Sequence, residues 1–246
     1  MTTTIFIMAL LIPLAVTSPQ SRTGKSPSFV SYKGDNNVPI QNFAGDCFVA
    51  FTDISGFKAM MKDGERAARA IDALYGAGFN VLSSNTDVNG FFISDCGVLF
   101  SRGNDQKTQL ESLLKVVRAV NQEVLEHDIM LTTSIAWGDF SYHNRIEFPG
   151  INKQPIYGNA YVSAFLDNEA GSPRLQPGQC RIIKEGVPTD VFSSVALDSP
   201  MESVKSYYYF YWMVEDTQGI QEFKRRYQDS YNLKYAGMLN AIRGRG

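Results

Sequence analysis

The chain has 246 residues, of which 44% are hydrophobic and 20% are charged, as is typical of one large globular domain. The formal net charge of −2 offers no basic field for a nucleic-acid partner. Three scattered cysteines and two histidines argue against a disulfide framework, a zinc site and a Ser-His-Asp relay. Oxygen ligands for magnesium or manganese fit this composition better.

Residues 1–42 are predicted to form an apolar and flexible extension before a domain that spans residues 43–246. Ile5–Val16 is a nearly unbroken apolar run that is too short for a membrane span. No Lys or Arg precedes this run, as a signal peptide would require, and Ser18–Asn42 has the composition of a linker. A targeting segment and an upstream extension of little consequence both stay open.

The regular pattern begins at Cys47–Asp53, a short apolar run that predicts a buried strand. Ile54–Phe57 turns the chain through a glycine. Lys58–Ser84 then carries apolar residues at helical spacing, with Gly76 and Gly78 as possible breaks.

A hairpin and a long helix follow. Phe91–Ile93 and Gly97–Phe100 flank Ser94 and Asp95 and predict two strands joined by a tight turn. Lys107–His127 has its leucines and valines on one face and predicts an amphipathic helix.

The remaining segments complete an alternating order of strands and helices. Strands are predicted at Leu131–Ala136, Gly138–Tyr142, Arg181–Ile183 and Tyr207–Val214, and helices at Tyr161–Ala170 and Gln218–Ile242. The order strand–helix–strand–strand–helix–strand is that of the ferredoxin-like, split βαβ plan. We therefore expect an α+β fold with a mixed, mostly antiparallel sheet and helices on one face.

Two aspartates stand at the ends of predicted strands. Asp53 ends the first strand, and Asp95 lies in the hairpin between the next two. Because the first and third core strands of a ferredoxin-like sheet are neighbours, we expect these carboxylates to meet at one sheet end. Two carboxylates that share a site repel each other unless a cation compensates, so the pair predicts divalent metal held against a triphosphate. The alternative is that Asp53 is a helix cap and Asp95 a turn residue.

The turn after the first strand adds a second feature. A strand that passes through Gly56 into a helix presents backbone amides and the positive end of the helix dipole to phosphate. Lys58 at the start of that helix adds positive charge.

Four segments in this order resemble the motifs of class III nucleotide cyclases. Phe51–Phe57 resembles the first metal motif and Phe92–Phe100 the second. Leu131–Phe140 resembles the strand and glycine turn that follow, and Ile156–Ala164 the motif that reaches the active site of the partner subunit. The Asp-Ile-x-Gly-Phe form and the later residues 170–174 are most similar to the bacterial Pycsar pyrimidine cyclases.

The resemblance implies an enzyme that converts UTP or CTP into cUMP or cCMP and pyrophosphate as a signal in antiphage defence. It also implies a homodimer with active sites at the interface and two Mn²⁺ or Mg²⁺ ions per site. Asp53, Asp95 and the Ile54 carbonyl would hold these ions. The nucleotide would contact Ile54, Ser55, Gly56, Phe57, Phe91 and Tyr157. Such chemistry uses a cytosolic triphosphate, so we expect a cytoplasmic protein with no stable membrane span.

Two departures from the family pattern concern the base. Phe91 stands at the position of an adenine-selecting Lys, and Pro155 at that of an Asp. Neither side chain can hydrogen-bond adenine, which argues against an adenylate or guanylate cyclase and agrees with a smaller pyrimidine ring. Phe91 can alternatively be a core residue of its strand.

Two further departures concern the transition state. Val162 and Leu166 stand where the family has an Asn and an Arg. An active enzyme then needs another cation, for which Arg174 and Arg181 are the candidates, although either can be an ordinary arginine. The other alternative is a cyclase-like module that binds nucleotide without turnover.

Overall fold

The computed structural model describes residues 40–143, 145–148, 151–153, 155–194, 199–230 and 234–244. The predicted extension, including Ile5–Val16, therefore lies almost wholly outside the described residues. In the described ranges, no helix is both long and apolar enough to cross a membrane.

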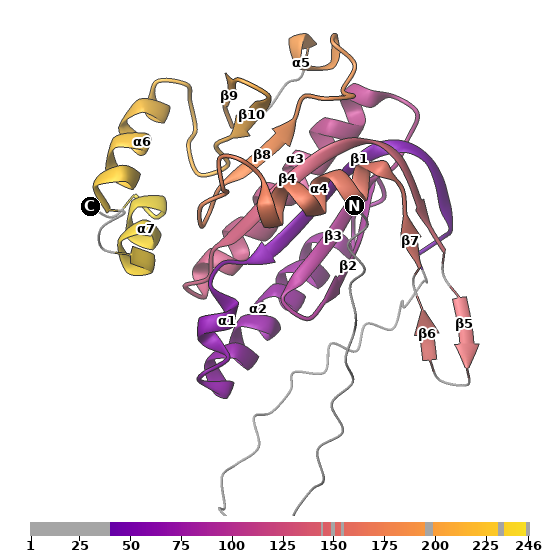
Figure 1. Ribbon diagram of the computed structural model, residues 1–246, viewed down its shortest axis with the longest axis horizontal. Coiled ribbons are helices and arrows are strands. Elements are labelled where there is room, and N and C mark those ends of the chain that lie inside the picture. Colours follow the sequence, from indigo (N-terminus) through magenta and orange to yellow (C-terminus); the bar gives the residue numbers. More distant parts are fainter. Residues whose placement is uncertain are drawn as a thin grey trace, which may run out of the picture.

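Figure 1 shows the elements in their order along the chain. They are β1 (Phe43–Ile54), α1 (Phe57–Met60), α2 (Gly64–Leu82), β2 (Val88–Ile93), β3 (Cys96–Ser101), α3 (Gln106–Glu126), β4 (Leu131–Tyr142), β5 (Arg145–Phe148), β6 (Ile151–Lys153), β7 (Ile156–Tyr157), α4 (Asn159–Ala170), β8 (Cys180–Ile183), α5 (Val191–Ser194), β9 (Met201–Val204), β10 (Tyr207–Phe210), α6 (Gly219–Ser230) and α7 (Lys234–Ile242).

The main sheet has the strand order β2-β3-β1-β4-β8-β10-β9, with β7 paired to the end of β4. Its first four strands follow the split βαβ order, with α2 connecting β1 to β2 and α3 connecting β3 to β4. The β4–β8 pair is parallel and the other pairs are antiparallel. The predicted ferredoxin-like α+β fold is confirmed. β5 and β6 form a separate hairpin that projects from the body (Figure 1).

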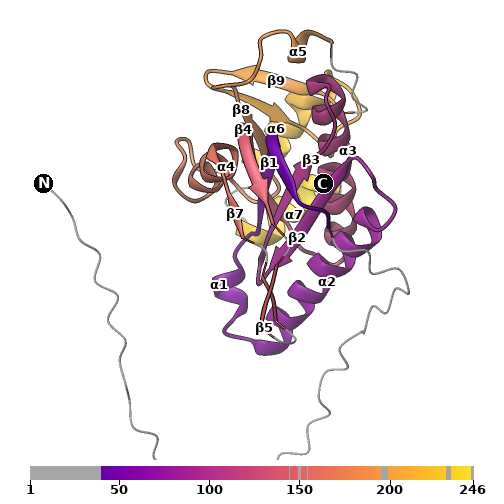
Figure 2. The same ribbon diagram turned by 90° about the vertical axis from the view of Figure 1, so that its right-hand side faces the viewer.

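Side chains of β1 alternate between two cores, because successive residues of a strand point to opposite faces. Phe48 and Ala50 belong to the larger core, which contains residues of α2 and α3. Val49 and Phe51 belong to a smaller core with Ala160 of α4. Figure 2 shows the sheet edge-on, with α4 on one side and α2 and α3 on the other. The expectation that the helices lie on one face of the sheet therefore holds for α2 and α3, whereas α4 covers part of the opposite face.

The prediction of one continuous helix over Lys58–Ser84 is wrong near its start, where the chain forms two separate helices. The chain leaves the helix after Met60 and re-enters it at Gly64. The cause is local, because the side chain of Asp63 accepts a hydrogen bond of 3.2 Å from the amide of Arg66 and caps α2.

Gly76 and Gly78 lie inside α2 and do not break it. A Cβ atom at Gly78 would come within 2.0 Å of the Phe92 ring. Glycine here lets α2 approach β2 closely, which outweighs its low helix propensity.

Three other boundaries differ from those predicted. β4 is one strand from Leu131 to Tyr142 rather than two, because it pairs with β1 along its whole length. The strand predicted over Tyr207–Val214 ends at Phe210. The C-terminal segment Gln218–Ile242 contains two helices, α6 and α7, rather than one.

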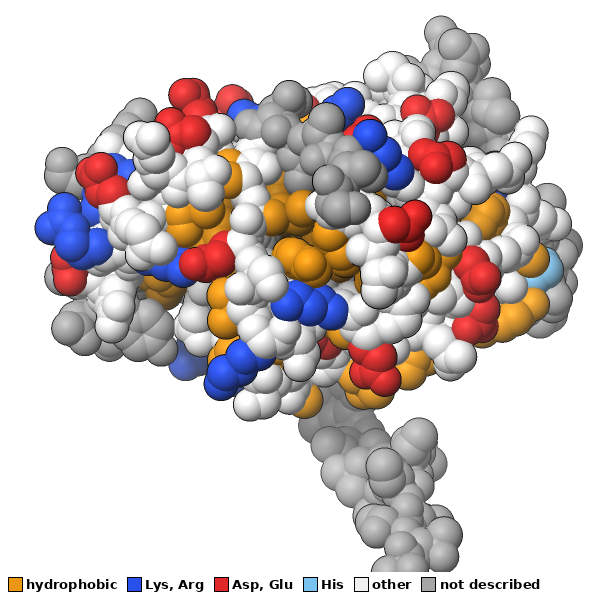
Figure 3. All heavy atoms as spheres, turned by 90° about the horizontal axis from the view of Figure 1, so that it is seen from above, with side chains coloured by type: hydrophobic (Ala, Val, Ile, Leu, Met, Phe, Trp, Pro, Cys, Tyr) orange, Lys and Arg blue, Asp and Glu red, His pale blue; other side chains and the backbone are white. Residues whose placement is uncertain are grey.

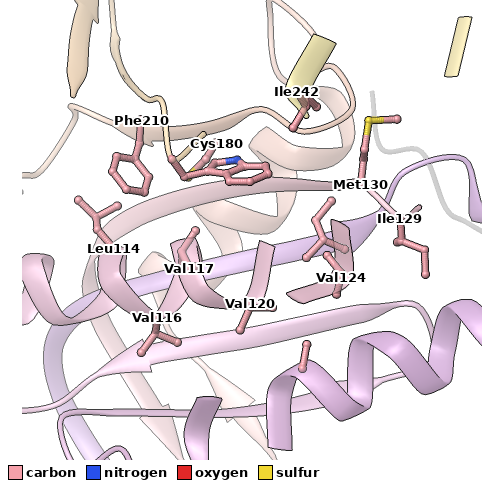
Figure 4. Close-up of a cluster of buried hydrophobic side chains, with 14 of the residues drawn as sticks. Leu114, Val116, Val117, Val120, Val124, Ile129, Met130, Cys180, Phe210 and Ile242 are labelled. Carbon is pink, nitrogen blue, oxygen red and sulfur yellow. The ribbon is translucent and has the colours of Figure 1, made fainter. Parts of the chain in front are cut away.

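The C-terminal helix takes part in the larger core. Figure 4 shows Ile242 of α7 in the same cluster as Met130, Cys180 and Phe210 and the valines of α3. On the outside, the view from above in Figure 3 shows Lys and Arg interspersed with Asp and Glu.

Candidate active site

Asp53 and Asp95 lie at the same end of the sheet. Asp53 is paired with Cys96 in the β1–β3 ladder, and the amide of Ile54 donates a hydrogen bond of 2.9 Å to the carbonyl of Asp95. Ser94 has a left-handed φ of 55° in the tight turn that carries Asp95. The strand order therefore brings the two aspartates together as the sequence predicts.

The site is strongly acidic. Burial, followed by the charges of Asp95 and Glu169, raises the pKa of Asp53 from 3.8 to about 7. Burial, followed by the charges of Asp53, Asp95 and Glu169, raises the pKa of Cys96 to about 11. A divalent cation at this position would relieve the repulsion. In the part of the chain that the structure describes, no cluster of three or more His, Cys, Asp or Glu side chains is arranged as a metal site.

Glu169 is a residue of this site that the sequence does not reveal. It is exposed near the C-terminal end of α4. The preceding Asn168 donates hydrogen bonds to the carbonyl oxygens of Phe51 (3.3 Å) and Thr132 (3.2 Å), which fixes this end of α4 against β1 and β4. Glu169 comes near Asp53 through this tertiary contact, and no motif around it predicts that.

The turn after β1 has free hydrogen-bonding groups. Ser55 donates its amide to the carbonyl of Met130 (2.9 Å), and Gly56 has a left-handed φ of 77° that favours glycine. Among the described residues, the amides of Gly56, Phe57 and Lys58 donate to no acceptor. The Ser55 hydroxyl is buried and has no hydrogen-bond partner there either. A buried hydroxyl without a partner is costly, so this turn suits a ligand that supplies acceptors.

The helix dipole expected at this turn is weaker than predicted. α1 has 4 residues, and the long helix α2 begins only at Gly64. Backbone amides, rather than the end of a long helix, are what the turn offers to phosphate.

Phe91 is only 6% exposed and its ring centroid lies 5.8 Å from that of Tyr142. It belongs to the smaller core, so its ring has little free surface in one chain. Pro155 is half-buried before β7.

Tyr157 lies far from the aspartates within one chain. It is exposed, and its hydroxyl lies 3.0 Å from Nε2 of His143. It pairs with Ser141, which pairs with Ala44 of β1. Ala44 precedes Asp53 by nine residues on β1, or about 30 Å along a strand. One chain therefore does not bring Tyr157 to the metal motif.

Val162 and Leu166 are 47% and 55% exposed on α4, beside Phe165 at 37%. They form an apolar outer face on this helix where the family resemblance predicts an Asn and an Arg.

The prediction that Arg181 could serve as the missing cation is wrong. It is fully buried, and its Nε and Nη2 each lie 2.8 Å from a carboxylate oxygen of Asp167. Tyr207 also donates to Asp167 (3.0 Å), and its ring lies 4.1 Å from the guanidinium carbon. A buried guanidinium needs such a partner, so Arg181 is bound within the fold and is not available to a phosphate.

Arg174 is exposed on the loop between α4 and β8. It borders a cavity of about 440 Å³ whose wall also includes Tyr209 and Lys224. No contact among the described residues joins Arg174 to Asp53, and its catalytic role stays a prediction.

No family model and no curated protein matches the chain. Its fold is similar to that of solved class III cyclase domains. The adenylyl cyclase CyaB from P. aeruginosa has a TM-score of 0.50 at 16% identity and covers 70% of this chain and 96% of its own. The guanylate cyclase domain of RhGC from Catenaria anguillulae, solved with GTP, has a TM-score of 0.50 at 9% identity and covers 69% and 97%. The guanylyl cyclase domain of RhoGC from Blastocladiella emersonii has the same TM-score at 10% identity and the same coverage.

Proposed function

We propose that this chain is a cytoplasmic nucleotide cyclase that converts UTP or CTP into the 3′,5′-cyclic monophosphate and pyrophosphate. The 3′-oxygen forms a bond to the α-phosphorus, and the bond from that phosphorus to the bridging oxygen breaks. Pyrophosphate leaves with the bridging oxygen, and the hydroxyl proton is released to water. The reaction needs positioning and charge neutralisation more than covalent chemistry from the protein.

The observation that carries the proposal is the pair Asp53 and Asp95 beside a turn with free amides. Asp53 is held in a setting that raises its pKa to about 7, which a cation would reverse. The Ser55 hydroxyl and the amide of Gly56 face no acceptor among the described residues.

Mn²⁺ or Mg²⁺ fits this donor set of carboxylate and carbonyl oxygens. Asp53, Asp95 and the Ile54 carbonyl would hold the ions, which when bound neutralise phosphate charge and lower the pKa of the attacking hydroxyl. The turn Ser55–Phe57 would bind the triphosphate through its amides, and Lys58 would add charge.

The pyrimidine assignment rests on what the site lacks. Phe91 and Pro155 offer no side-chain hydrogen bond to a purine edge. The burial of Phe91 leaves Tyr157, exposed on β7, as the better ring for a base. The use of the product as a signal in antiphage defence is proposed on the motif resemblance alone.

A homodimer would complete the site. Tyr157 is displaced along the sheet from the Asp53 end, so a head-to-tail pair would bring it to the metal motif of the other copy. The exposed Val162 and Leu166 suit burial in such an interface.

The same two residues favour a second candidate, a cyclase-like module that binds nucleotide without turnover. An exposed valine and leucine cannot stabilise phosphate charge, and Arg181 is paired inside the fold. Only Arg174 stays available of the two arginines considered.

A turnover assay separates these functions. The purified chain is incubated with Mn²⁺ and ATP, GTP, CTP or UTP in turn, and cyclic products are quantified by chromatography. We expect product from UTP or CTP, and its loss to background in Asp53→Ala and Asp95→Ala.

Asp46→Ala is the matched control, because Asp46 is an exposed aspartate on the same strand, seven residues before Asp53. Circular dichroism checks that all variants fold. A clear preference for ATP or GTP would contradict the pyrimidine assignment, and no product from any nucleotide would favour the non-catalytic module.

A further inference from the structure

The C-terminal helix α7 packs beside the turn that follows β1. Ile242 places its end in the larger core next to Met130 (Figure 4). At its beginning, the ring of Tyr235 lies against the turn, because a Cβ atom built at Gly56 would be 4.0 Å from Cδ2 of Tyr235.

The Tyr235 hydroxyl fixes the segment before β4. It accepts a hydrogen bond of 3.0 Å from the amide of Met130 and donates one of 3.2 Å to the carbonyl of Asp128. Asp128 has a left-handed φ of 62°, which a residue with a side chain rarely adopts. The hydroxyl therefore bridges the two ends of a three-residue bend, one of them strained.

That bend in turn holds the triphosphate turn. The carbonyl of Met130 accepts the amide of Ser55 at 2.9 Å, and the carbonyl of Asp95 accepts the amide of Ile54 at 2.9 Å. These two bonds attach the end of β1 to its neighbours. Tyr235 and Ser55 share Met130 as a partner, because the Met130 amide donates to the Tyr235 hydroxyl and the Met130 carbonyl accepts from the Ser55 amide.

We propose that Tyr235 is a positioning residue through which the C-terminal helix orders the Ser55–Phe57 turn for the triphosphate. The helix contributes no group to the substrate itself. The Tyr235 hydroxyl keeps the free amides of Gly56 and Phe57 in one arrangement, so that these amides need not be ordered when the ligand binds. The link to a triphosphate rests on the proposed function, whereas the tether itself does not.

Tyr235→Phe tests the tether, because it removes the hydroxyl and keeps the ring against Gly56. Tyr227→Phe is the matched control. Tyr227 lies on the neighbouring α6 and likewise donates to a backbone carbonyl, that of Pro177 at 2.6 Å, and no hydrogen bond among the described residues joins Pro177 to residues 54–57.

The first readout is amide hydrogen exchange of the segment 53–60 in the metal-free full chain. We expect exchange at Ser55 to rise on the order of three- to tenfold in Tyr235→Phe, as the loss of one hydrogen bond allows, and to stay unchanged in Tyr227→Phe. Unchanged exchange in Tyr235→Phe, or an equal rise in both variants, would overturn the inference.

The second readout is the KM for the metal–triphosphate at equal protein stability. We expect Tyr235→Phe to raise KM several-fold with little change in kcat, while Tyr227→Phe leaves both unchanged. Equal KM in wild type and Tyr235→Phe would contradict the positioning role. Faster Ser55 exchange in Tyr235→Phe, together with a wild type that shows no turnover, would support the tether and contradict the cyclase assignment alone.

Discussion

Asp53 is a residue whose chemistry depends strongly on its surroundings. Burial and the charges of Asp95 and Glu169 disfavour its ionised form. The metal-free fold therefore favours the protonated acid, whereas a bound cation requires the ionised form. Protons are expected to leave Asp53 when metal enters.

This setting predicts a pH-dependent cost in the metal-free protein. The pKa of Asp53 is about 7 in the fold against an ordinary 3.8. Well below pH 3.8 the group is protonated in both states and has no effect on stability. As pH rises from about 4 to 7, the unfolded chain ionises first, so wild type loses stability relative to Asp53→Asn, by at least about 1 kcal/mol at pH 8.

Urea unfolding of both proteins with a chelator, between pH 4 and pH 8, measures this difference. Saturating Mn²⁺ should stabilise wild type alone and reverse the order at pH 8. A difference between the two proteins that does not change with pH would show that Asp53 is not in the acidic setting described.

At the scale of single elements, local patterns predict well where local forces decide the structure. β1, the β2–β3 hairpin and α3 follow from apolar runs and helical periodicity, and strand order then brings Asp53 to Asp95. The break before α2 depends on one capping aspartate, Asp63, within an otherwise helical pattern. The approach of Glu169 and the pairing of Arg181 depend on how α4 packs across the sheet, which no local pattern contains.

The exposed apolar face of α4, formed by Val162, Phe165 and Leu166, is the surface where we expect a second copy of the chain to bind. If a second copy covers it, Val162→Glu and Leu166→Glu place a charge in a buried interface and should weaken the dimer at least tenfold, on the order of 1.4 kcal/mol or more. Sedimentation equilibrium measures the dissociation constant. Val204→Glu on β9, a residue of similar character at 37% exposure, is the control and should leave the dimer intact. A dimer that tolerates both α4 charges would exclude this face.

At the scale of the whole molecule, the residues assigned to the proposed site lie at two places in one chain. The acidic pair and the amide-rich turn lie at one end of β1, and Tyr157 lies near the other end on β7. The fold is that of class III cyclase domains. The α7 helix, which holds the bend before β4, adds a C-terminal support to the half that carries the aspartates.

The most direct test of the central claim is calorimetric binding of 3′-deoxy-UTP and 3′-deoxy-CTP, which cannot cyclise, with and without Mn²⁺. We predict metal-dependent binding of at least one analogue to wild type and to Asp46→Asn. Asp53→Asn and Asp95→Asn should each weaken that binding by at least about tenfold, since even residues that only support metal ligands have effects of this size. Binding that persists unchanged in both of these variants, or that does not require Mn²⁺, would contradict the two-carboxylate metal site.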